Sequence, residues 1–256
     1  MPPIERVLVV GATGRTGRHV VEAAVARGLT PVALVRDEAR ARRLLPPGTE
    51  IVTGDLTAPD TLTGAVRDID AVVFVHGSDG DSRPESFEEI DYGGVANVLA
   101  ALGDRRPRIV LQPTIFVTRR DHSFNTGGHA LDWKRRSERL VRRSGAPYTI
   151  IRPGWLDAGE GGKHLRIEQG DTGEGSIGRD ALGALLAEAL LDDTALGRTF
   201  EVFSGPGPAT TDFTALFSEA QPDTPGVLDA VQDTDNLPLD AEPADVRDDL
   251  AHLRTH

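Results

Sequence analysis

The sequence predicts an α/β protein with a doubly wound parallel sheet in a three-layer α/β/α arrangement. Short β-branched runs alternate along the chain with segments in which apolar residues recur every three to four positions, as in amphipathic helices. The runs VLVV and AVVFV are apolar throughout, which is typical of strands that helices cover on both faces. A chain of 256 residues can bury one full core, so we expect a single packed body.

The strand-like runs are regularly spaced over the first two thirds of the chain. Six of them precede residue 152, at 6–10, 31–35, 50–53, 71–75, 108–111 and 148–151. A glycine-rich stretch at 158–175 then predicts a loop with a short strand at 165–168, followed by a helix at 179–191 and a strand at 199–203. We therefore place the main domain at residues 1–204.

The C-terminal segment, residues 205–256, differs in composition from the rest of the chain. From residue 218 onward it holds ten acids against two arginines, so it carries eight of the twelve net negative charges. Short helices are indicated at 213–220 and 245–253. We expect an irregular acidic extension that packs on the main domain, and a disordered tail is the alternative that this composition leaves open.

The strongest motif is VLVVGATGRTGRHVVEAA, which predicts a strand, a turn with Gly11, Gly14 and Gly17, and a helix. A diphosphate needs main-chain N–H groups at close range and a positive helix end, and residues without Cβ let the backbone approach it. The spacing is GxxGxxG rather than the GxGxxG of standard Rossmann-type folds, and an ordinary tight turn is the alternative. The hydroxyls of Thr13 and Thr16 could add donors to the phosphates.

Two arginines favour NADP over NAD as the dinucleotide. Arg36 follows the second strand about twenty residues after the glycines, where a carboxylate selects NAD and an arginine accepts a 2′-phosphate. Arg15 projects from the glycine turn toward the same region, and guanidinium groups bind a phosphate dianion with charge-assisted hydrogen bonds. Asp37 supports the opposite choice, because its carboxylate could take the ribose hydroxyls.

Further cofactor contacts are expected at the ends of the third and fourth strands. Asp55 and Leu56, in the sequence GDL, are placed to meet the adenine edge, while His76 and Gly77, in HGS, follow the fourth strand beside the cofactor. A helix cap or turn residue is the alternative for Asp55.

Composition limits the partners. A net charge of −12 disfavours nucleic acid and anionic membrane surfaces. The chain has no cysteine, which excludes disulfides and thiolate chemistry and favours a reducing compartment. Its first residues contain no apolar stretch long enough for a signal peptide, so a cytoplasmic location is expected. The basic run KRRSERLVRR is predicted to be a helix whose arginines form a solvated face.

The motifs VGATGRTG, LVRD, GDL, FVHGS and WKRRSERLVRRSGAPYTIIRPGW, in this order, resemble the atypical short-chain dehydrogenase/reductases. The resemblance is to the NmrA-like and flavin (biliverdin) reductase-like branch, and it covers residues 6–203. It implies a Rossmann-type fold, an NAD(P) cofactor and reductase chemistry, and it says little about the substrate.

In typical members of this family a Ser or Thr after the fifth strand and a Tyr-x-x-x-Lys pair on the next helix carry proton transfer and position the cofactor. By this resemblance Thr114, in QPTIFV, takes the hydroxyl position and Lys134 takes the lysine position. The tyrosine position falls on Ala130, so the usual proton donor is missing. Tyr92 is an alternative donor if it approaches the site, although an aromatic residue there is more often part of the core.

Lys134 stands out because the chain has two lysines and 26 arginines. A compact ammonium reaches ribose hydroxyls that a planar guanidinium fits badly, so we expect Lys134 to contact the nicotinamide ribose. The alternative is an exposed helix lysine paired with Glu138, a contact worth about 0.2–0.5 kcal/mol.

The sixth strand ends in IRPGWLD, which places Pro153, Gly154 and Trp155 at the carboxyl edge of the sheet beside the nicotinamide. Together with Thr114, Phe116 and Tyr92, Trp155 is expected to line the substrate pocket, with a plain core position as the alternative for the indole.

These observations predict an NADP-dependent reductase that passes hydride to a small conjugated or carbonyl acceptor. The alternative is an NmrA-type protein that binds NADP(H) as a redox sensor and does not turn it over. We expect a small-molecule substrate and a monomer or weak homodimer. No metal is predicted, because the histidines lack zinc spacing and the stretch SDGDSRPESFEE has Arg83 and Pro84 where a calcium loop needs a ligand and a glycine.

Overall fold

The computed structural model describes residues 3–78, 83–159 and 163–253. Residues 79–82, which belong to the stretch compared with a calcium loop, lie outside this part of the chain. The main sheet has eight strands in the order β3-β2-β1-β4-β5-β6-β10-β8, and every neighbouring pair is parallel except β10 and β8. Its strands are β1 (Arg6–Val10), β2 (Thr30–Val35), β3 (Glu50–Thr53), β4 (Ala71–Phe74), β5 (Arg108–Leu111), β6 (Tyr148–Pro153), β8 (His164–Glu168) and β10 (Arg198–Gly205).

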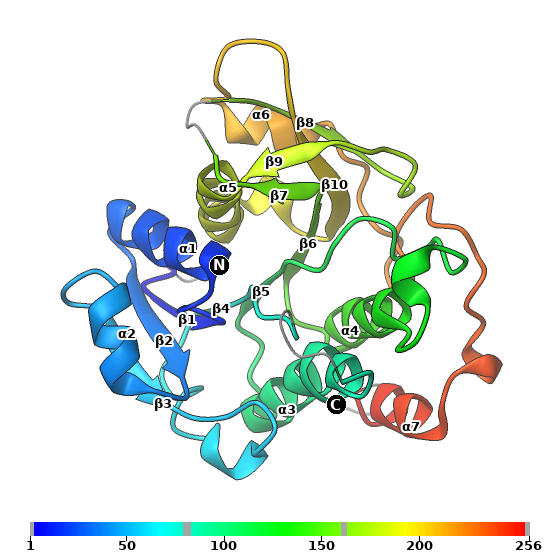
Figure 1. Cartoon of the computed structure of the whole chain (residues 1–256), viewed down its shortest axis with the longest axis horizontal. Helices are drawn as coiled ribbons and strands as arrows, with labels where there is room; N and C mark the ends of the chain where they lie inside the picture. Colours follow the sequence, from blue (N-terminus) through cyan, green and yellow to red (C-terminus); the bar gives the residue numbers. More distant parts are fainter. Residues whose placement is uncertain (1–2, 79–82, 160–162, 254–256) are drawn as a thin grey trace.

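Helices cover both faces of the sheet, so the molecule has three layers (Figure 1). Successive side chains of β1 show why: Val7 and Val9 pack into one apolar cluster, and Leu8 and Val10 pack into another on the opposite face. The first cluster contains α1 (Arg15–Ala26), α2 (Glu38–Leu44), α5 (Arg179–Leu191) and α6 (Phe213–Ser218). The second contains α3 (Gly93–Leu102), α4 (Ala130–Arg143) and α7 (Ala244–His252).

The predicted α/β class and the parallel sheet are confirmed, and most expected strands lie within two residues of their observed bounds. The helix expected at 179–191 coincides with α5. Two short strands were not expected, β7 (Trp155–Asp157) and β9 (Ser176–Gly178), which pair in parallel as a separate sheet beyond the end of β6. A π-helical turn, Phe87–Tyr92, precedes α3.

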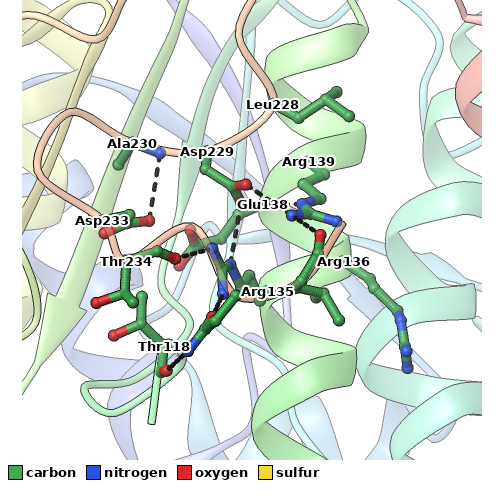
Figure 2. A network of polar contacts seen from close by, with 12 residues as sticks. Thr118, Arg135, Arg136, Glu138, Arg139, Leu228, Asp229, Ala230, Asp233 and Thr234 are labelled. Carbon is green, nitrogen blue, oxygen red and sulfur yellow. Dashed lines mark hydrogen bonds and ion pairs between the residues drawn. The ribbon is translucent and has the colours of Figure 1, made fainter. Parts of the chain in front are cut away.

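The C-terminal segment follows the outside of α4 before it ends in α7 (Figure 1). Long irregular stretches separate α6, a single turn at Leu239–Ala241 and α7. Ion pairs anchor the segment to α4. Asp229 accepts hydrogen bonds from both Arg135 and Arg139 (Figure 2). Glu242 accepts hydrogen bonds from Arg136 and Arg139. This part of the chain is therefore irregular but tied to the main domain over its described length.

The prediction that the arginines of α4 form a solvated face is wrong. Arg135, Arg136, Arg139 and Arg142 are all buried or nearly so, and their partners are carboxylates and carbonyls of the C-terminal segment. A buried guanidinium is tolerated only when it is paired and its donors are satisfied. Three acids of the segment, Asp223, Asp229 and Glu242, pair with these arginines, and Glu138 of α4 also pairs with Arg142.

The network continues into the sheet through Arg152 on β6. Its guanidinium pairs with Glu138 of α4, Glu201 of β10 and Asp233 of the C-terminal segment, and the side chains of all four residues are fully buried. Glu138 is thus committed to Arg152 and Arg142, so it is not the partner of Lys134 that the alternative interpretation required.

No helix in the described residues is long and apolar enough to span a membrane. Among the same residues, no group of three or more His, Asp or Glu side chains is arranged to hold a metal ion.

Candidate active site

A large cavity opens at the carboxyl end of the parallel strands, where ligands bind in doubly wound sheets. Its volume is about 1140 Å³. It is lined by residues that follow β1, β2, β3, β4, β5 and β6, and by Lys134 from α4. Most of the predicted site residues line it: Thr13, Gly11, Gly14, Arg15, Thr16, Arg36, Asp55, Leu56, His76, Gly77, Thr114, Lys134, Pro153 and Gly154.

The glycine turn leaves no room for side chains. A Cβ on Gly17 would lie 2.0 Å from the carbonyl oxygen of Gly11, and a Cβ on Gly11, whose φ is +93°, would lie 2.8 Å from the backbone of His76. Helix α1 begins directly after Gly14, which supplies no side-chain cap, so the first N–H groups of the helix are left for another acceptor. This cradle fits a diphosphate. Gly11 and Gly14 line the cavity, whereas Gly17 lies outside its lining and allows α1 to approach the backbone of Gly11 closely.

Three arginines line the cavity where β2 ends and where α1 and α2 begin: Arg15, Arg36 and Arg40. Arg40 was not predicted. It lies in the first turn of α2, and its position shortly after Arg36 in the sequence was the available signal. Asp37 caps α2 by accepting a hydrogen bond from the Arg40 backbone N–H at 2.8 Å, so this carboxylate is occupied at the helix end.

Asp55 and Leu56 lie in the cavity wall after β3. The Asp55 carboxylate accepts hydrogen bonds from the backbone and the hydroxyl of Thr57, both at 2.9 Å, and the backbone bond is the main cause of a lowered Asp55 pKa. The side chain therefore holds its own turn, as the alternative interpretation expected, while the residue also borders the cavity. Asn97 of α3 fixes the next residue by donating to the carbonyl of Leu56.

His76 is neutral in the cavity wall. Its Nε2 lies 3.0 Å from the carbonyl oxygen of Ile90, which can only accept, so Nε2 carries the proton. Burial is the main cause that lowers the His76 pKa to about 4. The imidazole thus links the end of β4 to the π-helical turn without adding a charge.

Four residues mark the expected nicotinamide end of the cavity: Pro113 and Thr114 after β5, and Pro153 and Gly154 at the end of β6. A Cβ on Gly154 would lie 2.4 Å from the carbonyl oxygen of Gly175, so only glycine lets these two backbone segments approach.

Lys134 reaches the cavity from α4, and its side chain is 17% exposed. Its ammonium forms a short ion pair with Oδ1 of Asp91, which is buried at the end of the π-helical turn. The other oxygen of Asp91 accepts hydrogen bonds from Ser78, 3.2 Å from the backbone nitrogen and 2.6 Å from the hydroxyl. Sequence reasoning missed both partners: Ser78 ends the motif FVHGS but was given no role, and Asp91 belongs to no motif and lies 43 residues before Lys134.

Tyr92 does not lie where the prediction needs it. It is absent from the cavity lining, packs against Trp133 in the core and donates its hydroxyl to Asp249 of α7 at 2.8 Å. The other tyrosine of the chain, Tyr148, donates to Asp223 at 3.0 Å. Burial is the main cause that raises the pKa of both phenols. Neither tyrosine can therefore act as the missing proton donor.

The rings of Phe116 and Trp155 also lie outside the cavity lining, in an aromatic cluster next to its nicotinamide end. We define this rim cluster as Phe116, His122, Phe124 and Trp155, whose rings form a closed circuit with centroid separations of 4.8, 4.9, 5.5 and 5.9 Å. Phe124 is 50% exposed and Trp155 is 44% exposed. His122 and Phe124 were not predicted, because they lie in an irregular loop with no motif.

The backbone at Phe116 is held in an uncommon conformation. Its φ is +73°, a region that bulky side chains rarely adopt. The buried carboxylate of Asp171 secures it by accepting hydrogen bonds from the backbone N–H groups of Phe116, at 2.5 Å, and Thr118, at 2.9 Å. The Asp171 side chain therefore fixes the loop that carries Thr114 and Phe116.

Comparison with known proteins agrees with this geometry. A family model described as NAD(P)H-binding matches residues 11–193. Sanguinarine reductase from Eschscholzia californica is 30% identical over 260 residues, which cover 83% of this chain and 95% of the relative. The structure of a putative NAD-dependent epimerase/dehydratase from Bacillus halodurans superposes with a TM-score of 0.74 at 27% identity, covering 84% of this chain and 99% of the other. A short-chain dehydrogenase/reductase from Veillonella parvula in complex with NADP shares the fold, with a TM-score of 0.63 at 16% identity, covering 81% and 98% of the two chains.

The fold, the glycine cradle and these matches define a dinucleotide-binding enzyme of the NAD(P)H-binding family, to which this chain belongs. The reductase among its relatives agrees with the predicted resemblance to the reductase-like branch of the atypical short-chain dehydrogenase/reductases and with an NAD(P)-dependent oxidoreductase.

Proposed function

We propose that this protein is an NADP(H)-dependent reductase that passes hydride to a small conjugated or carbonyl acceptor. The observation that carries the choice of NADP is the group of three guanidiniums, Arg15, Arg36 and Arg40, on the cavity wall beside the glycine turn. A 2′-phosphate placed there gains charge-assisted hydrogen bonds that NAD cannot make. Asp37 supports the same choice, because it caps α2 through Oδ1 and is not among the residues that line the cavity.

The residues present fit the rest of the cofactor. The glycine turn and the start of α1 would hold the diphosphate, and Lys134 would hold the nicotinamide ribose. The bound nicotinamide supplies hydride chemistry. Thr114, on the cavity wall after β5, would donate its hydroxyl hydrogen bond to the acceptor oxygen.

The rim cluster supports a flat acceptor. Exposed Phe124 and Trp155 border the nicotinamide end, and their ring faces can stack on a conjugated ligand. A conjugated acceptor also suits a site without a tyrosine, because hydride addition then produces a delocalised anion that needs less help from a proton donor. The relative named sanguinarine reductase supports a reductase activity for this site.

A non-catalytic NADP(H) sensor is the second candidate. The observation that favours it is that neither tyrosine of the chain reaches the cavity. Such a protein would bind the nucleotide and leave it unchanged.

One experiment separates the two candidates. The purified protein is incubated with NADPH and, in turn, with quinones, flavins, conjugated ketones and sanguinarine, and absorbance at 340 nm is followed. If the protein is a reductase, it consumes NADPH with at least one acceptor, at a rate higher than that of a Lys134→Met variant. Tight NADPH binding without consumption across the panel would favour the sensor.

A further inference from the structure

Asp91 joins three elements that surround the cavity. It is the fifth residue of the π-helical turn Phe87–Tyr92. One of its carboxylate oxygens contacts Lys134 of α4, and the other contacts Ser78 in the segment that follows β4. Its neighbour Ile90 uses its carbonyl oxygen to hold His76. Single π-helical turns are rare and often found at functional sites. Here two successive residues of the turn, Ile90 and Asp91, hold two side chains that line the cavity, those of His76 and Lys134.

The Asp91 carboxylate is 4% exposed, so it needs donors to remain charged. Ser78 provides two donors, and the Lys134 ammonium provides a third. The nearby Lys134 charge lowers the Asp91 pKa against the opposing effect of burial. Asp91 and Lys134 therefore form an ionised pair in the cavity wall.

Such a pair restricts a side chain that is otherwise mobile. Lysine has four rotatable side-chain bonds, and ordering them on ligand binding costs free energy. An ammonium has three N–H donors, of which one is directed at Asp91, so two are left for hydroxyl groups in the cavity. Asp91 therefore prepares Lys134 for a ligand with two neighbouring hydroxyls.

We propose that Asp91, held by Ser78, is a positioning residue that fixes the Lys134 ammonium for the nicotinamide ribose of NADP(H). The inference rests on the proposed function, because it assigns the nicotinamide half of the cofactor to this end of the cavity. Asp91 acts through Lys134, and the two residues work as one unit.

The test compares two ligands that differ in the half of the cofactor that Lys134 would contact. NADPH contains the nicotinamide ribose, whereas adenosine 2′,5′-bisphosphate carries only the adenosine half with its phosphates. Dissociation constants for both are measured by calorimetry on the wild type, Asp91→Asn, Lys134→Met and the double variant. Glu88→Gln is the matched control, since it removes a carboxylate from an exposed position of the same π-helical turn.

We expect Asp91→Asn to weaken NADPH binding about tenfold, the loss of roughly one charged hydrogen bond, and to leave adenosine 2′,5′-bisphosphate within about twofold of the wild type. Adding Asp91→Asn to Lys134→Met should change NADPH affinity by less than about twofold, because the partner is already absent. Ser78→Ala, which keeps the carboxylate, should show a smaller loss of the same kind. Glu88→Gln should match the wild type.

Three results would overturn the inference. If Asp91→Asn leaves NADPH affinity unchanged, or weakens both ligands equally, Asp91 supports the fold and not Lys134. If the fold-loss of NADPH affinity in the double variant equals the product of the two single losses, the residues act independently and the inference fails. If the wild type binds neither ligand, the proposed function fails as well, so the two failures are distinguishable.

Discussion

Arg139 and Glu242 form an ion pair across the boundary between α4 and the C-terminal segment, with 2.6 Å between Nη1 and Oε1. The Arg139 side chain is 2% exposed, and the Glu242 side chain is fully buried. The same guanidinium binds Asp229 through Nε and Nη2, at 2.9 and 2.6 Å (Figure 2). The acidic C-terminal segment therefore provides the charges that keep the arginines of α4 inside the molecule.

Arg139→Ala should destabilise the protein by about 3–5 kcal/mol, because Asp229 and Glu242 each lose one of their two guanidinium partners in a buried network. Urea unfolding followed by circular dichroism measures this change. The matched control is Arg42→Ala, whose exposed pair with Glu38 should contribute about 0–1 kcal/mol. If both variants lose the same unfolding free energy, the buried network does not hold the C-terminal segment.

The raised pKa of Glu201 should make the stability of the protein depend on pH. Burial is the main cause that raises its pKa to about 7, despite the opposing effect of Arg152. The folded state therefore binds a proton on Glu201 more tightly than the unfolded state does. The resulting stability is fully present below the ordinary value near 4.5 and is lost as pH rises through 7.

Glu201→Gln should remove this dependence. The free energy of unfolding is measured in urea at pH 5, 6, 7 and 8 for both proteins, and the wild type should lose stability relative to the variant as pH rises. If the difference in unfolding free energy between the wild type and Glu201→Gln stays constant from pH 5 to pH 8, Glu201 is not the source of the pH dependence.

Gly17→Ala tests the cradle. The added Cβ would lie 2.0 Å from a backbone oxygen, so α1 must shift, at a cost of about 1–3 kcal/mol. Thermal unfolding should show the loss, and NADPH should bind more weakly because the first turn of α1 moves. Gly64→Ala is the control, since a Cβ there meets only open space. A Gly17→Ala variant as stable as the Gly64→Ala control would argue against the close approach.

Phe124→Ala and Trp155→Ala test the rim cluster as the acceptor surface. Because both rings are about half exposed, each variant should keep its melting temperature, while the KM for a flat acceptor rises about three- to tenfold and the Kd for NADPH stays constant. Leu239→Ala removes an exposed apolar side chain elsewhere and serves as the control. If KM is unchanged in both aromatic variants, the acceptor binds away from this cluster.

The sequence predicted the parts of the molecule that depend on local pattern. The bounds of β1, β3, β5 and α5 follow directly from continuous apolar runs or helical periodicity, and the glycine turn follows from spacing. These features are set by residues close together in the chain. The small β7 and β9 sheet was missed because strands of three residues carry almost no periodic signal.

The polar interior could not be predicted, because its partners are far apart in the sequence. Arg139 and Glu242 are separated by 103 residues, and the run KRRSERLVRR alone looks like a solvated helix face. Lys134 was identified by its rarity, but its partner Asp91 lies in an unmarked acidic stretch on another element. Only the fold shows which charges meet.

Arginines beside the glycine turn are proposed to select NADP(H) over NAD(H). Calorimetric titration of the wild type and Arg36→Ala with NADPH and NADH tests this selection directly, with Arg43→Ala on the exposed side of α2 as the control. We expect the wild type to prefer NADPH by at least about tenfold, the value of one charged hydrogen bond, and Arg36→Ala to lose this preference by weakening NADPH binding alone. Equal affinity of the wild type for the two nucleotides, or no binding of either at millimolar concentration, would contradict it.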